Sequence, residues 1–571
     1  MPLMIGDGCW MPYRRGSAVR VRTPALLSAL LLTIVPAAAA CSLGSHADGC
    51  RAEAITVAAA PTIAPAVEQT ARRYNARTTC VRVTVLREEP ADVAGVLSGQ
   101  GSSPGAVRPD AWIPDSSLWL PVARRTRLGA AAVRPSGTSI ASSPLVLAAA
   151  QGRSPNQVSW RLLLSSRLPG TGAARPAVRV RFLDPTTQAS GLGALMLAHQ
   201  ASGAGKSGLS TFAITLYSDL GSALPDDKAA YEAMFRGGDP PTAVVLSEQS
   251  VWQHNHVDPK RPVSARYPAD GTLALDFPYV SATTDRERSR TVEDFRDALS
   301  QSPAREALQS LGLRTPDGVA GAGFGPRYGV AAEAPAPTRP QDPATVGRIL
   351  QMWQRTVLGA RMLILLDVSP SMGDPVPRGK ETRMRATTQA AIGGTRILSD
   401  NSQVALWEFS TRLDGDRDYR QLVPYRQLTQ RVGTGTQRDA VIAAFNAARP
   451  APGTRTALYD SVLAAYREAV RTYQPDRNNV LVVLTDGMNY DPGHTILLQE
   501  LLKELGRIAD PLKPVAIVPI AFGPDIDPAP LQQIAARTGG QAFVTLDPGQ
   551  IQQVFLEMLI RLTCGEECPM S

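Results

Sequence analysis

The chain of 571 residues has little lysine, few aromatic residues and no stretch in which basic and aromatic side chains alternate. Only six of its 59 basic residues are lysines, and aromatic residues make up 5% of the sequence. The formal net charge of +8 is spread along the chain, and part of it lies in the first 40 residues. A nucleic-acid interface needs basic residues gathered in a patch or stripe. The sequence therefore argues against nucleic acid as a partner.

Long apolar runs are also missing after residue 40. The one near the amino terminus is ALLSALLLTIVPAAAA, residues 25–40, and it follows an arginine-rich segment. A run of this length is short for a membrane span, and its end in small residues is typical of a cleaved signal. Residues 1–40 are therefore predicted to be a signal peptide of the lipoprotein type, and the mature protein is expected outside the cytoplasm.

The sequence AAAAC, residues 37–41, resembles a bacterial lipobox. This resemblance implies that Cys41 is lipidated, becomes the first residue of the mature chain and anchors it to the cell membrane. Ordinary secretion, with Cys41 free or paired, is the alternative.

Cysteine is scarce, with six residues in the whole chain. Cys9 would be removed with the signal and Cys41 acylated, which leaves Cys50, Cys80, Cys564 and Cys568. Disulfides persist outside the cytoplasm, and the spacing favours the pairs Cys50–Cys80 and Cys564–Cys568. The CGEEC spacing of the second pair is also typical of metal or redox sites, but the neighbouring sequence offers no further ligand.

Histidine is scarce as well, and none of the five lies in a recognisable catalytic motif. No nucleophile–base pair is visible, so the protein is not expected to be an enzyme.

Two short motifs resemble functional sites but are not interpreted as such. GAGKS, residues 203–207, lacks the first glycine of a phosphate-binding loop and follows a helical pattern instead of a strand. In HNH, residues 254–256, the two histidines have no evident third metal ligand.

A chain of this length is too long for one core. After the signal, residues 41–52 are a short linker, and residues 331–344, AAEAPAPTRPQDPA, are a Pro-rich segment without apolar periodicity, predicted to be an extended linker. They delimit a first region, 53–330, and a second region, 345–562, which begins with a connector helix. Residues 563–571 form a C-terminal tail.

The first region alternates strand and helix patterns. AITVAAA reads as a strand, IAPAVEQTARRYN as a helix and CVRVTVL as a strand, and this order predicts a parallel sheet. These segments, with RPDAWIPDSSLW, SSPLVLA and DPTTQASGLGALM, resemble the bacterial extracellular solute-binding family with the type II periplasmic-binding fold. The resemblance implies two α/β lobes with a ligand in the cleft between them.

The resemblance also implies ligand contacts at the loop ends of the first region, where hydroxyls and free N–H groups at helix starts suit a small molecule or an anion. The candidates are Pro61, Thr62, Ser142, Ser143, Thr187 and Ser190. The alternative is that these hydroxyls only cap helices.

In the second region, strands of continuous apolar residues alternate with helices. MLILLD, NNVLVVLTDG and VAIVPIAFG are such strands. Strands of this kind are covered on both faces, so we expect a doubly wound α/β sheet with its site at the carboxyl ends of the strands.

Oxygen side chains follow these strand ends. Asp367, Ser369 and Ser371 follow the first strand in LLDVSPSM, Thr456 lies at a helix start in GTRTALYD, and Asp486 follows a later strand in LTDG. Two carboxylates and three hydroxyls without histidine or cysteine suit a hard cation such as Mg²⁺ or Mn²⁺ and disfavour zinc.

The DxSxS, Thr and TDG elements resemble the von Willebrand factor A domain and its metal-ion-dependent adhesion site. The resemblance implies that Ser369, Ser371 and Thr456 bind the cation directly, and that Asp367 and Asp486 act largely through water. It also implies an open coordination position for a carboxylate of a protein partner. Pro370 stands where a small residue is common in this family.

Three functions remain open at this stage. The first is a lipid-anchored interaction protein whose second region captures a protein partner through a metal, with the first region as a sensor or scaffold. The second is a receptor that delivers a solute to a membrane transporter. The third is a metal-dependent hydrolase, which the hydroxyl-rich metal site disfavours.

Overall fold

The fold is taken from a computed structural model. It describes residues 53–545 except 79, 102–106, 154–156, 165–177, 220–222, 339–341, 377–380, 492–495 and 524–525, together with 554, 557 and 558. The predicted signal peptide, the acylated Cys41, and the cysteines Cys50, Cys564 and Cys568 lie outside the described residues. Cys80 is described and is disulfide-bonded.

The first region contains two sheets, as the two-lobed fold predicts. The first has the order β2-β1-β3-β11-β4, in which β1 pairs in parallel with β2 and β3. Its strands are β1 (Glu53–Ala59), β2 (Val81–Arg87), β3 (Ala111–Ile113), β4 (Arg134–Ser139) and β11 (Pro278–Ser281). Its helices are α1 (Ala64–Asn75), α2 (Pro90–Ser98), α3 (Trp119–Ala123), α4 (Arg127–Ala132), α9 (Arg286–Leu299) and α10 (Ser302–Gln309).

The second sheet has the order β10-β5-β8-β6-β7, with β9 beside β5. Its strands are β5 (Ser143–Ala150), β6 (Arg179–Leu183), β7 (Ala223–Leu224), β8 (Thr242–Ser247), β9 (Val263–Arg266) and β10 (Ala274–Leu275). Its helices are α5 (Ala189–Ser202), α6 (Gly205–Asp219), α7 (Asp227–Phe235) and α8 (Glu248–Val257). The chain crosses from the first sheet to the second between β4 and β5, returns between β10 and β11, and crosses again after α10, where the carbonyl of Gly329 accepts from the N–H of Ala265 in β9.

The Pro-rich segment is extended, as predicted, but residues 331–338 are fastened to the first region; we call them the strap. The guanidinium of Arg314, 1% exposed, pairs with both carboxylate oxygens of the fully buried Glu248 at 2.7 and 2.8 Å. The same guanidinium donates to the carbonyls of Ala331 and Ala332. Further along, the backbone N–H of Thr338 donates to the carbonyl of Thr272. The strap is therefore part of the first region.

The helix after the strap, α11 (Pro343–Val357), also packs into the first region, although the sequence suggested a connector grouped with the second. Its apolar face recurs at helical spacing and is buried at Val346, Ile349, Leu350 and Trp353 in the same core as β1 and α5. The Trp353 ring meets Phe182 edge to face at 5.4 Å. The helix ends at Val357, and Gly359, two residues later, has a φ of +69°, the left-handed conformation common just after a helix.

The second region is built on a six-stranded sheet of order β14-β13-β12-β17-β18-β19. The strands are β12 (Ala360–Asp367), β13 (Gln403–Asp414), β14 (Arg417–Gln427), β17 (Asn478–Thr485), β18 (Ala516–Phe522) and β19 (Phe543–Thr545). All pairs are parallel except the edge strand β14, which runs antiparallel to β13. The doubly wound sheet predicted from the sequence is confirmed, with an antiparallel edge added.

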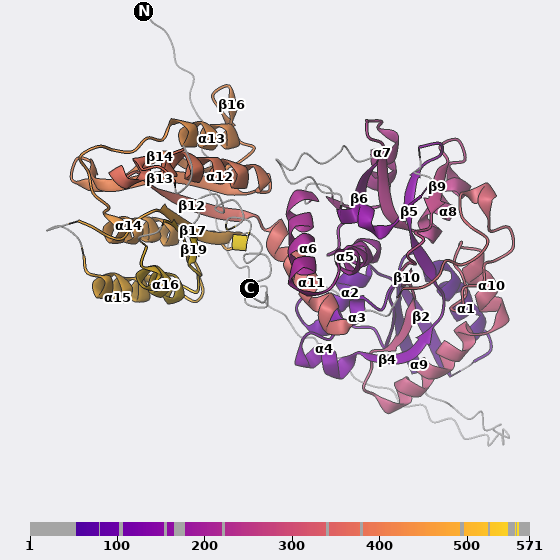
Figure 1. The fold of residues 1–571 in the computed structure, drawn as a ribbon. Coiled ribbons are helices and arrows are strands. Elements are labelled where there is room, and N and C mark those ends of the chain that lie inside the picture. Colours follow the sequence, from indigo (N-terminus) through magenta and orange to yellow (C-terminus); the bar gives the residue numbers. More distant parts are fainter. Residues whose placement is uncertain are drawn as a thin grey trace, which may run out of the picture. The chain divides into compact units, whose positions relative to one another are not determined.

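Helices cover both faces of this sheet (Figure 1). One face carries α12 (Arg383–Ile397) and α13 (Gln437–Ala447), and the other carries α14 (Leu458–Arg471), α15 (Leu498–Ile508) and α16 (Pro528–Arg537). All eight residues of β12 are buried because successive side chains point into opposite cores: Met362, Ile364 and Leu366 into one, and Leu363 and Leu365 into the other.

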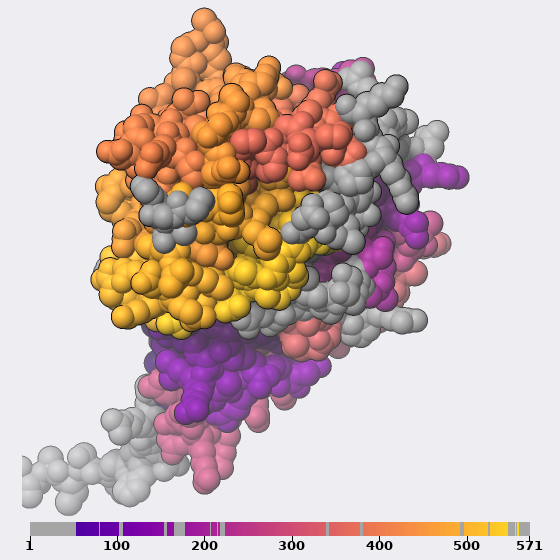
Figure 2. All heavy atoms as spheres, turned by 60° about the vertical axis from the view of Figure 1, so that its left-hand side comes forward, coloured from indigo at the N-terminus to yellow at the C-terminus, as the bar shows by residue number. Residues whose placement is uncertain are grey.

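A small hairpin stands apart from this layered core. It consists of β15 (Arg431–Val432) and β16 (Gly435–Thr436), which pair only with each other among the described strands. Figure 2 shows it as the orange projection at the top of the second region. It leads directly into α13, whose start is capped by Thr436.

Candidate metal site and ligand cavity

The candidate metal site lies where the sheet of the second region changes its winding direction. β12 is central, the chain winds outward from it to β13 on one side, and β17 lies on the other side. Loops that leave neighbouring strands in opposite directions open a crevice at the carboxyl edge of a parallel sheet. Asp367 is the last residue of β12, and Asp486 follows the last residue of β17 directly. The topology thus brings the two aspartates together.

Hydrogen bonds tie the first loop to the second. The backbone N–H of Ser369 donates to Oδ1 of Asp367 at 2.8 Å, and the hydroxyls of Ser369 and Ser371 lie 3.1 Å apart. The Ser371 hydroxyl donates to Oδ1 of Asp486 at 2.9 Å. On the other side, the Thr485 hydroxyl donates to Oδ2 of Asp367 at 2.6 Å. Four of the five predicted residues therefore form one connected group.

The fifth residue, Thr456, comes from a third loop. It pairs as an isolated bridge with Tyr490, in the loop after β17, and its backbone carbonyl accepts from the Tyr490 N–H. A Cβ placed on Gly487 would lie 3.8 Å from the Thr456 hydroxyl, so that hydroxyl lies against the residue that follows Asp486. The sequence placed Thr456 at a helix start, with the N-cap at this residue or just before it; in the structure α14 begins at Leu458 and its N-cap is Ala457, one residue later.

Burial shapes the electrostatics of this site. Asp367 is completely buried and Asp486 nearly so. Burial, and then the nearby charge of Asp486, raise the pKa of Asp367 above its usual range. Burial also raises the pKa of Asp486, although hydrogen bonds from Arg383 and Ser371 oppose that rise. Two buried carboxylates whose negative charge the protein compensates only in part are suited to a cation.

The donor set fits a hard divalent cation. All the side-chain donors of Asp367, Ser369, Ser371, Thr456 and Asp486 are oxygens, which Mg²⁺ and Mn²⁺ prefer. The sequence did not identify Arg383, whose Nη1 donates to Oδ2 of Asp486 at 2.9 Å. It is one of many arginines in this chain, and nothing in its local sequence sets it apart.

A separate trio of carboxylates lies elsewhere in the second region. One oxygen each of Asp418, Asp460 and Asp491 lies within 4.8 Å of the others, and all three residues are partly exposed. Backbone N–H groups of Arg412 and Ile496 donate to Asp418 and Asp460, so the fold already uses two of these side chains.

In the first region, the six predicted ligand contacts do not share one cavity. Pro61 and Thr62 line a cavity of about 840 Å³ together with Tyr231, Gln249 and His254. The other four predicted residues do not line it.

Three of those four hydroxyls make bonds within the protein, since the Thr187 hydroxyl donates to the carbonyl of Asp184 at 3.5 Å. The Ser142 hydroxyl donates to the carbonyl of Thr315 at 2.8 Å, and the Ser143 hydroxyl accepts from the backbone N–H of Gln249, in the first turn of α8, at 3.0 Å. Thr187 is exposed, and Ser190 is buried in the first turn of α5. The contact of Ser143 agrees with the alternative that such hydroxyls serve helix starts.

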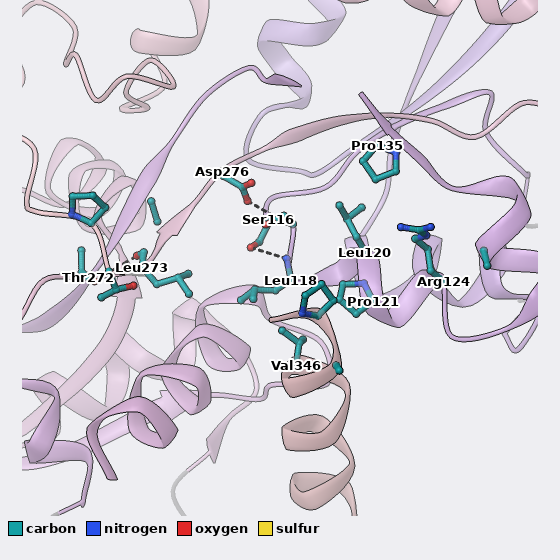
Figure 3. A pocket seen from close by; sticks show the side chains of 17 residues that line it. Ser116, Leu118, Leu120, Pro121, Arg124, Pro135, Thr272, Leu273, Asp276 and Val346 are labelled. Carbon is teal, nitrogen blue, oxygen red and sulfur yellow. Dashed lines mark hydrogen bonds between the residues drawn. The ribbon is translucent and has the colours of Figure 1, made fainter. Parts of the chain in front are cut away.

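A second cavity of about 730 Å³ is lined by three distant segments. Ser116, Leu118 and Arg124 come from the residues on either side of α3, Thr272–Asp276 from β10 and its neighbours, and Pro337 and Val346 from the strap and α11. Figure 3 shows Asp276 beside the loop that carries Ser116, and Val346 at the upper end of the helix in the lower part of the view, where α11 begins. The sequence did not indicate this cavity because its third wall lies in a segment predicted to be a linker.

The polar lining of this cavity consists of one carboxylate, Asp276, the guanidinium of Arg124 and the hydroxyls of Ser116, Ser117, Thr272 and Thr338. Oδ1 of Asp276 accepts from the backbone N–H of Ser117 at 2.7 Å, and burial raises its pKa. Just behind, Oδ1 of Asp115 accepts from the Trp119 indole, and burial raises the pKa of Asp115 to about 7.

The two motifs that were set aside lie on helices. GAGKS begins at the end of α5 and enters α6, so a helix and not a strand precedes it. His254 and His256 both lie on α8, where they stack on Tyr231 and Trp252 respectively. Two residues apart on a helix they face different directions, and they do not form a joint metal site.

Among the described residues, no helix is both long and apolar enough to span a membrane.

Comparison with known protein families divides the chain where the structure does. The profile of the bacterial extracellular solute-binding protein family matches residues 55–314, and that of the von Willebrand factor type A domain matches residues 362–557. Cavity-lining residues 337–346 lie outside both matches.

Among curated proteins, two uncharacterized proteins of Mycobacterium tuberculosis, from strains CDC 1551 / Oshkosh and ATCC 25618 / H37Rv, are similar over most of this chain. Each is 24% identical over 530 residues, which cover 86% of this chain and 73% of the relative.

Solved structures resemble the two regions separately. A von Willebrand factor type A protein from Catenulispora acidiphila is 20% identical and covers 37% of this chain and 43% of its own, with a TM-score of 0.28. The sulfate-binding protein SubI of Mycobacterium tuberculosis H37Rv is 16% identical and covers 49% of this chain and 93% of its own, with a TM-score of 0.35. Proximal thread matrix protein 1 of the mussel byssus, described with a zinc-occupied MIDAS motif, is 16% identical and covers 36% of this chain and 48% of its own, with a TM-score of 0.27.

Proposed function

We propose that this chain, a bacterial extracellular solute-binding domain followed by a von Willebrand factor A domain, is an extracytoplasmic interaction protein and not an enzyme. In this proposal the A domain holds Mg²⁺ or Mn²⁺ and, through it, an acidic group of a protein partner. The solute-binding domain serves as a ligand sensor or scaffold, and a lipid on Cys41 anchors the chain to the membrane.

The observation that carries the proposal is the convergence of three loops at the carboxyl edge of the sheet. Asp367 and Asp486 supply negative charge, while Ser369, Ser371 and Thr456 supply neutral oxygens. A bound divalent cation supplies a Lewis-acidic centre with a position for one more oxygen ligand. The hydroxyls keep the site's own charge low, which favours capture of a partner carboxylate over phosphoryl chemistry.

Metal binding tests the proposal most directly. Mg²⁺ or Mn²⁺ is expected to stabilise the full mature chain, by about 2.7 kcal/mol at a free concentration 100 times the dissociation constant. Asp367→Ala should abolish this stabilisation in thermal unfolding, and Ser371→Ala should weaken it less because one neutral ligand is lost. Asp374→Ala, an exposed residue just outside the motif, is the matched control. An equal response in wild type and Asp367→Ala would contradict the proposed site.

Partner capture tests the next step. A pull-down from membranes with the full mature chain is expected to retain a protein in Mg²⁺ and release it in EDTA, and Asp367→Ala should retain none. Retention that EDTA does not affect would refute a metal-bridged contact.

A second candidate function is a substrate-binding receptor of a membrane transporter. The two cavities of the solute-binding domain favour it, since both have the volume of typical small-molecule sites. A small molecule that co-purifies with the protein and is detected by native mass spectrometry would support this function, and a metal-independent phenotype would favour it over the first.

A further inference from the structure

Arg383, the first residue of α12, places a fixed positive charge against the candidate metal site. Its Nη1 donates to Oδ2 of Asp486 at 2.9 Å, while Oδ1 of the same carboxylate accepts from Ser371. The Asp486 side chain is fully buried and the Arg383 side chain is only 13% exposed. The pair therefore interacts with little screening by water.

The contact with Asp486 leaves the guanidinium incompletely satisfied. Among the residues that the structure describes, the buried Nε of Arg383 has no hydrogen-bond partner. Buried donors without partners are rare because their desolvation is not compensated. An acidic group brought by another molecule would therefore find a positive charge beside the metal site that Asp486 alone does not fully satisfy.

The charges of the site show what this arginine changes. In the ionised form that binds a cation, Asp367 and Asp486 carry two negative charges, and Arg383 reduces the sum to one. With a divalent cation the sum becomes one positive charge, which a single carboxylate neutralises. If Arg383 were absent, the cation alone would neutralise the site, and an added carboxylate would leave it negative. The nearby Asp374 is exposed, so water screens its contribution.

We propose that Arg383 weakens binding of the divalent cation and strengthens binding of the partner's carboxylate, so that the site takes up both together. This inference rests on the proposed function of the same site. It makes the guanidinium a specificity-determining group: it disfavours the metal-loaded site without a ligand and favours the site that holds one singly charged acidic group.

The proposal requires opposite effects on two binding events. In Arg383→Gln, affinity for Mn²⁺ should rise by about tenfold or more, because a like charge beside the cation is removed. Enhancement of Mn²⁺ binding by a carboxylate should fall in the same variant. A purely structural arginine that only orients Asp486 would give weaker binding of both.

The experiment titrates the full mature chain with Mn²⁺ by calorimetry, in chloride and in acetate at equal ionic strength. Wild type is expected to bind Mn²⁺ more tightly in acetate. Arg383→Gln should bind it more tightly than wild type in chloride and gain little from acetate. Arg385→Gln, which removes an exposed arginine two residues away on the same helix, should behave as wild type. All variants carry Asp460→Asn, which removes one carboxylate of the separate trio and so suppresses binding there.

Arg383→Lys separates the effect of the positive charge from the effect of the guanidinium's shape. It also tests the proposal if Arg383→Gln does not fold in the absence of metal. It keeps the positive charge, so its Mn²⁺ affinity should stay within about threefold of wild type and the acetate effect should persist. Loss of the acetate effect in Arg383→Lys would mean that the shape of the guanidinium, and not its charge, selects the anion, and would overturn the proposal.

The outcomes distinguish this inference from the function on which it rests. If wild type binds Mn²⁺ in a manner that Asp367→Ala abolishes, but Arg383→Gln binds it equally or more weakly, the role of Arg383 is refuted and the metal site stands. If wild type shows no Mn²⁺ binding that depends on Asp367, the proposed function itself is refuted.

Discussion

The two regions of the chain assemble their candidate sites in different ways. In the A domain, Asp367, Ser369 and Ser371 lie within one short loop, and Asp486 follows the neighbouring strand. In the solute-binding domain, the cavity of Figure 3 has walls from residues 116–124, from residues 272–276 and from the strap and α11, and the first and last of these lie more than 200 residues apart. Regular strand ends bring residues together by topology alone, whereas the cavity depends on how distant segments are held.

That difference also concerns what stabilises each site. The metal site is surrounded by two apolar cores on either side of β12. The strap that borders the cavity is held by polar contacts, above all by the buried pair of Arg314 and Glu248. The solute-binding domain should therefore be more sensitive to the loss of single long-range contacts.

The largest effect is expected for Glu248→Ala. Removing this carboxylate leaves Arg314 buried without its ionic partner and also removes an acceptor of Tyr267. Breaking a buried ion pair in this way costs about 3–5 kcal/mol. Hydrogen exchange of peptides from α5 should show the loss of stability, and peptides from α14 should not change.

Glu468→Ala is the control for this prediction, because it breaks a largely exposed pair with Arg471. Such pairs contribute less than about 1 kcal/mol. If both substitutions cost the same, the strap is not held by the buried pair.

Trp353→Ala tests where α11 belongs. Truncating a fully buried tryptophan costs about 3–5 kcal/mol, and the loss should fall on the solute-binding domain, since Trp353 packs on Phe182. Protease resistance of that domain should fall while Mn²⁺ affinity of the chain stays unchanged. Gln354→Ala, an exposed neighbour on the same helix, should have no such effect. A drop in Mn²⁺ affinity would assign the helix to the A domain.

The disulfide of Cys80 is expected to contribute somewhat less to the free energy of unfolding than these two side chains. Its predicted partner is Cys50, which would close a loop of about 30 residues and contribute about 3–4 kcal/mol by restricting the unfolded chain. A peptide map of the non-reduced protein should contain a fragment that links these two cysteines. A link from Cys80 to Cys564 or Cys568 would disprove the pairing and would connect the beginning and end of the chain instead.

The smallest change in stability is expected from a substitution of Asp115, and its size depends on pH. Burial raises the pKa of Asp115 to about 7, whereas an unfolded aspartate has a pKa of about 3.9. Below about pH 4 Asp115 is protonated in both the folded and the unfolded chain, so its raised pKa does not change stability. Between about pH 4 and 7 Asp115 loses its proton in the unfolded chain but keeps it in the folded chain. The free energy of unfolding therefore decreases as the pH rises through this range.

Asp115→Asn cannot ionise and its oxygen can still accept from Trp119. Its stability relative to wild type should therefore rise by about 1–2 kcal/mol from about pH 4 to about pH 8, because partial exposure reduces the full effect of the shift. Urea unfolding at the two pH values measures this difference. A constant difference across that range would mean that Asp115 ionises as easily in the folded chain as in the unfolded one.

Much of the fold could be predicted from the sequence because local patterns carry it. The all-apolar strand of β12 indicated a sheet covered on both faces, and the alternation at residues 54–86 indicated β1, α1 and β2. The edge strand β14 was not predicted. It is largely exposed and polar, so neither an apolar run nor a clear alternation marks it.

The candidate sites were predictable to different degrees for the same reason. The positions of Asp367, Ser371 and Asp486 follow from where strands end, and their placement together needs only the order of β12 and β17. Arg383 was missed because its role depends on a contact 103 residues away along the chain. The strap was interpreted as a free linker because proline-rich composition does not reveal that Arg314 donates to its backbone carbonyls.

The joint between α11 and β12 has a consequence for how such chains can recombine. Only Leu358 and Gly359 separate a helix whose apolar face fits the solute-binding core from a strand in the centre of the A domain. A gene fusion that exchanged A domains among relatives would preserve both cores only if the crossover fell at these two codons. The exchanged segment would have to include Gly359 together with its A domain, because a Cβ at position 359 would lie 2.6 Å from Oδ1 of Asn401. Among descendants of such exchanges, this glycine should therefore be inherited together with a residue of compatible size at position 401.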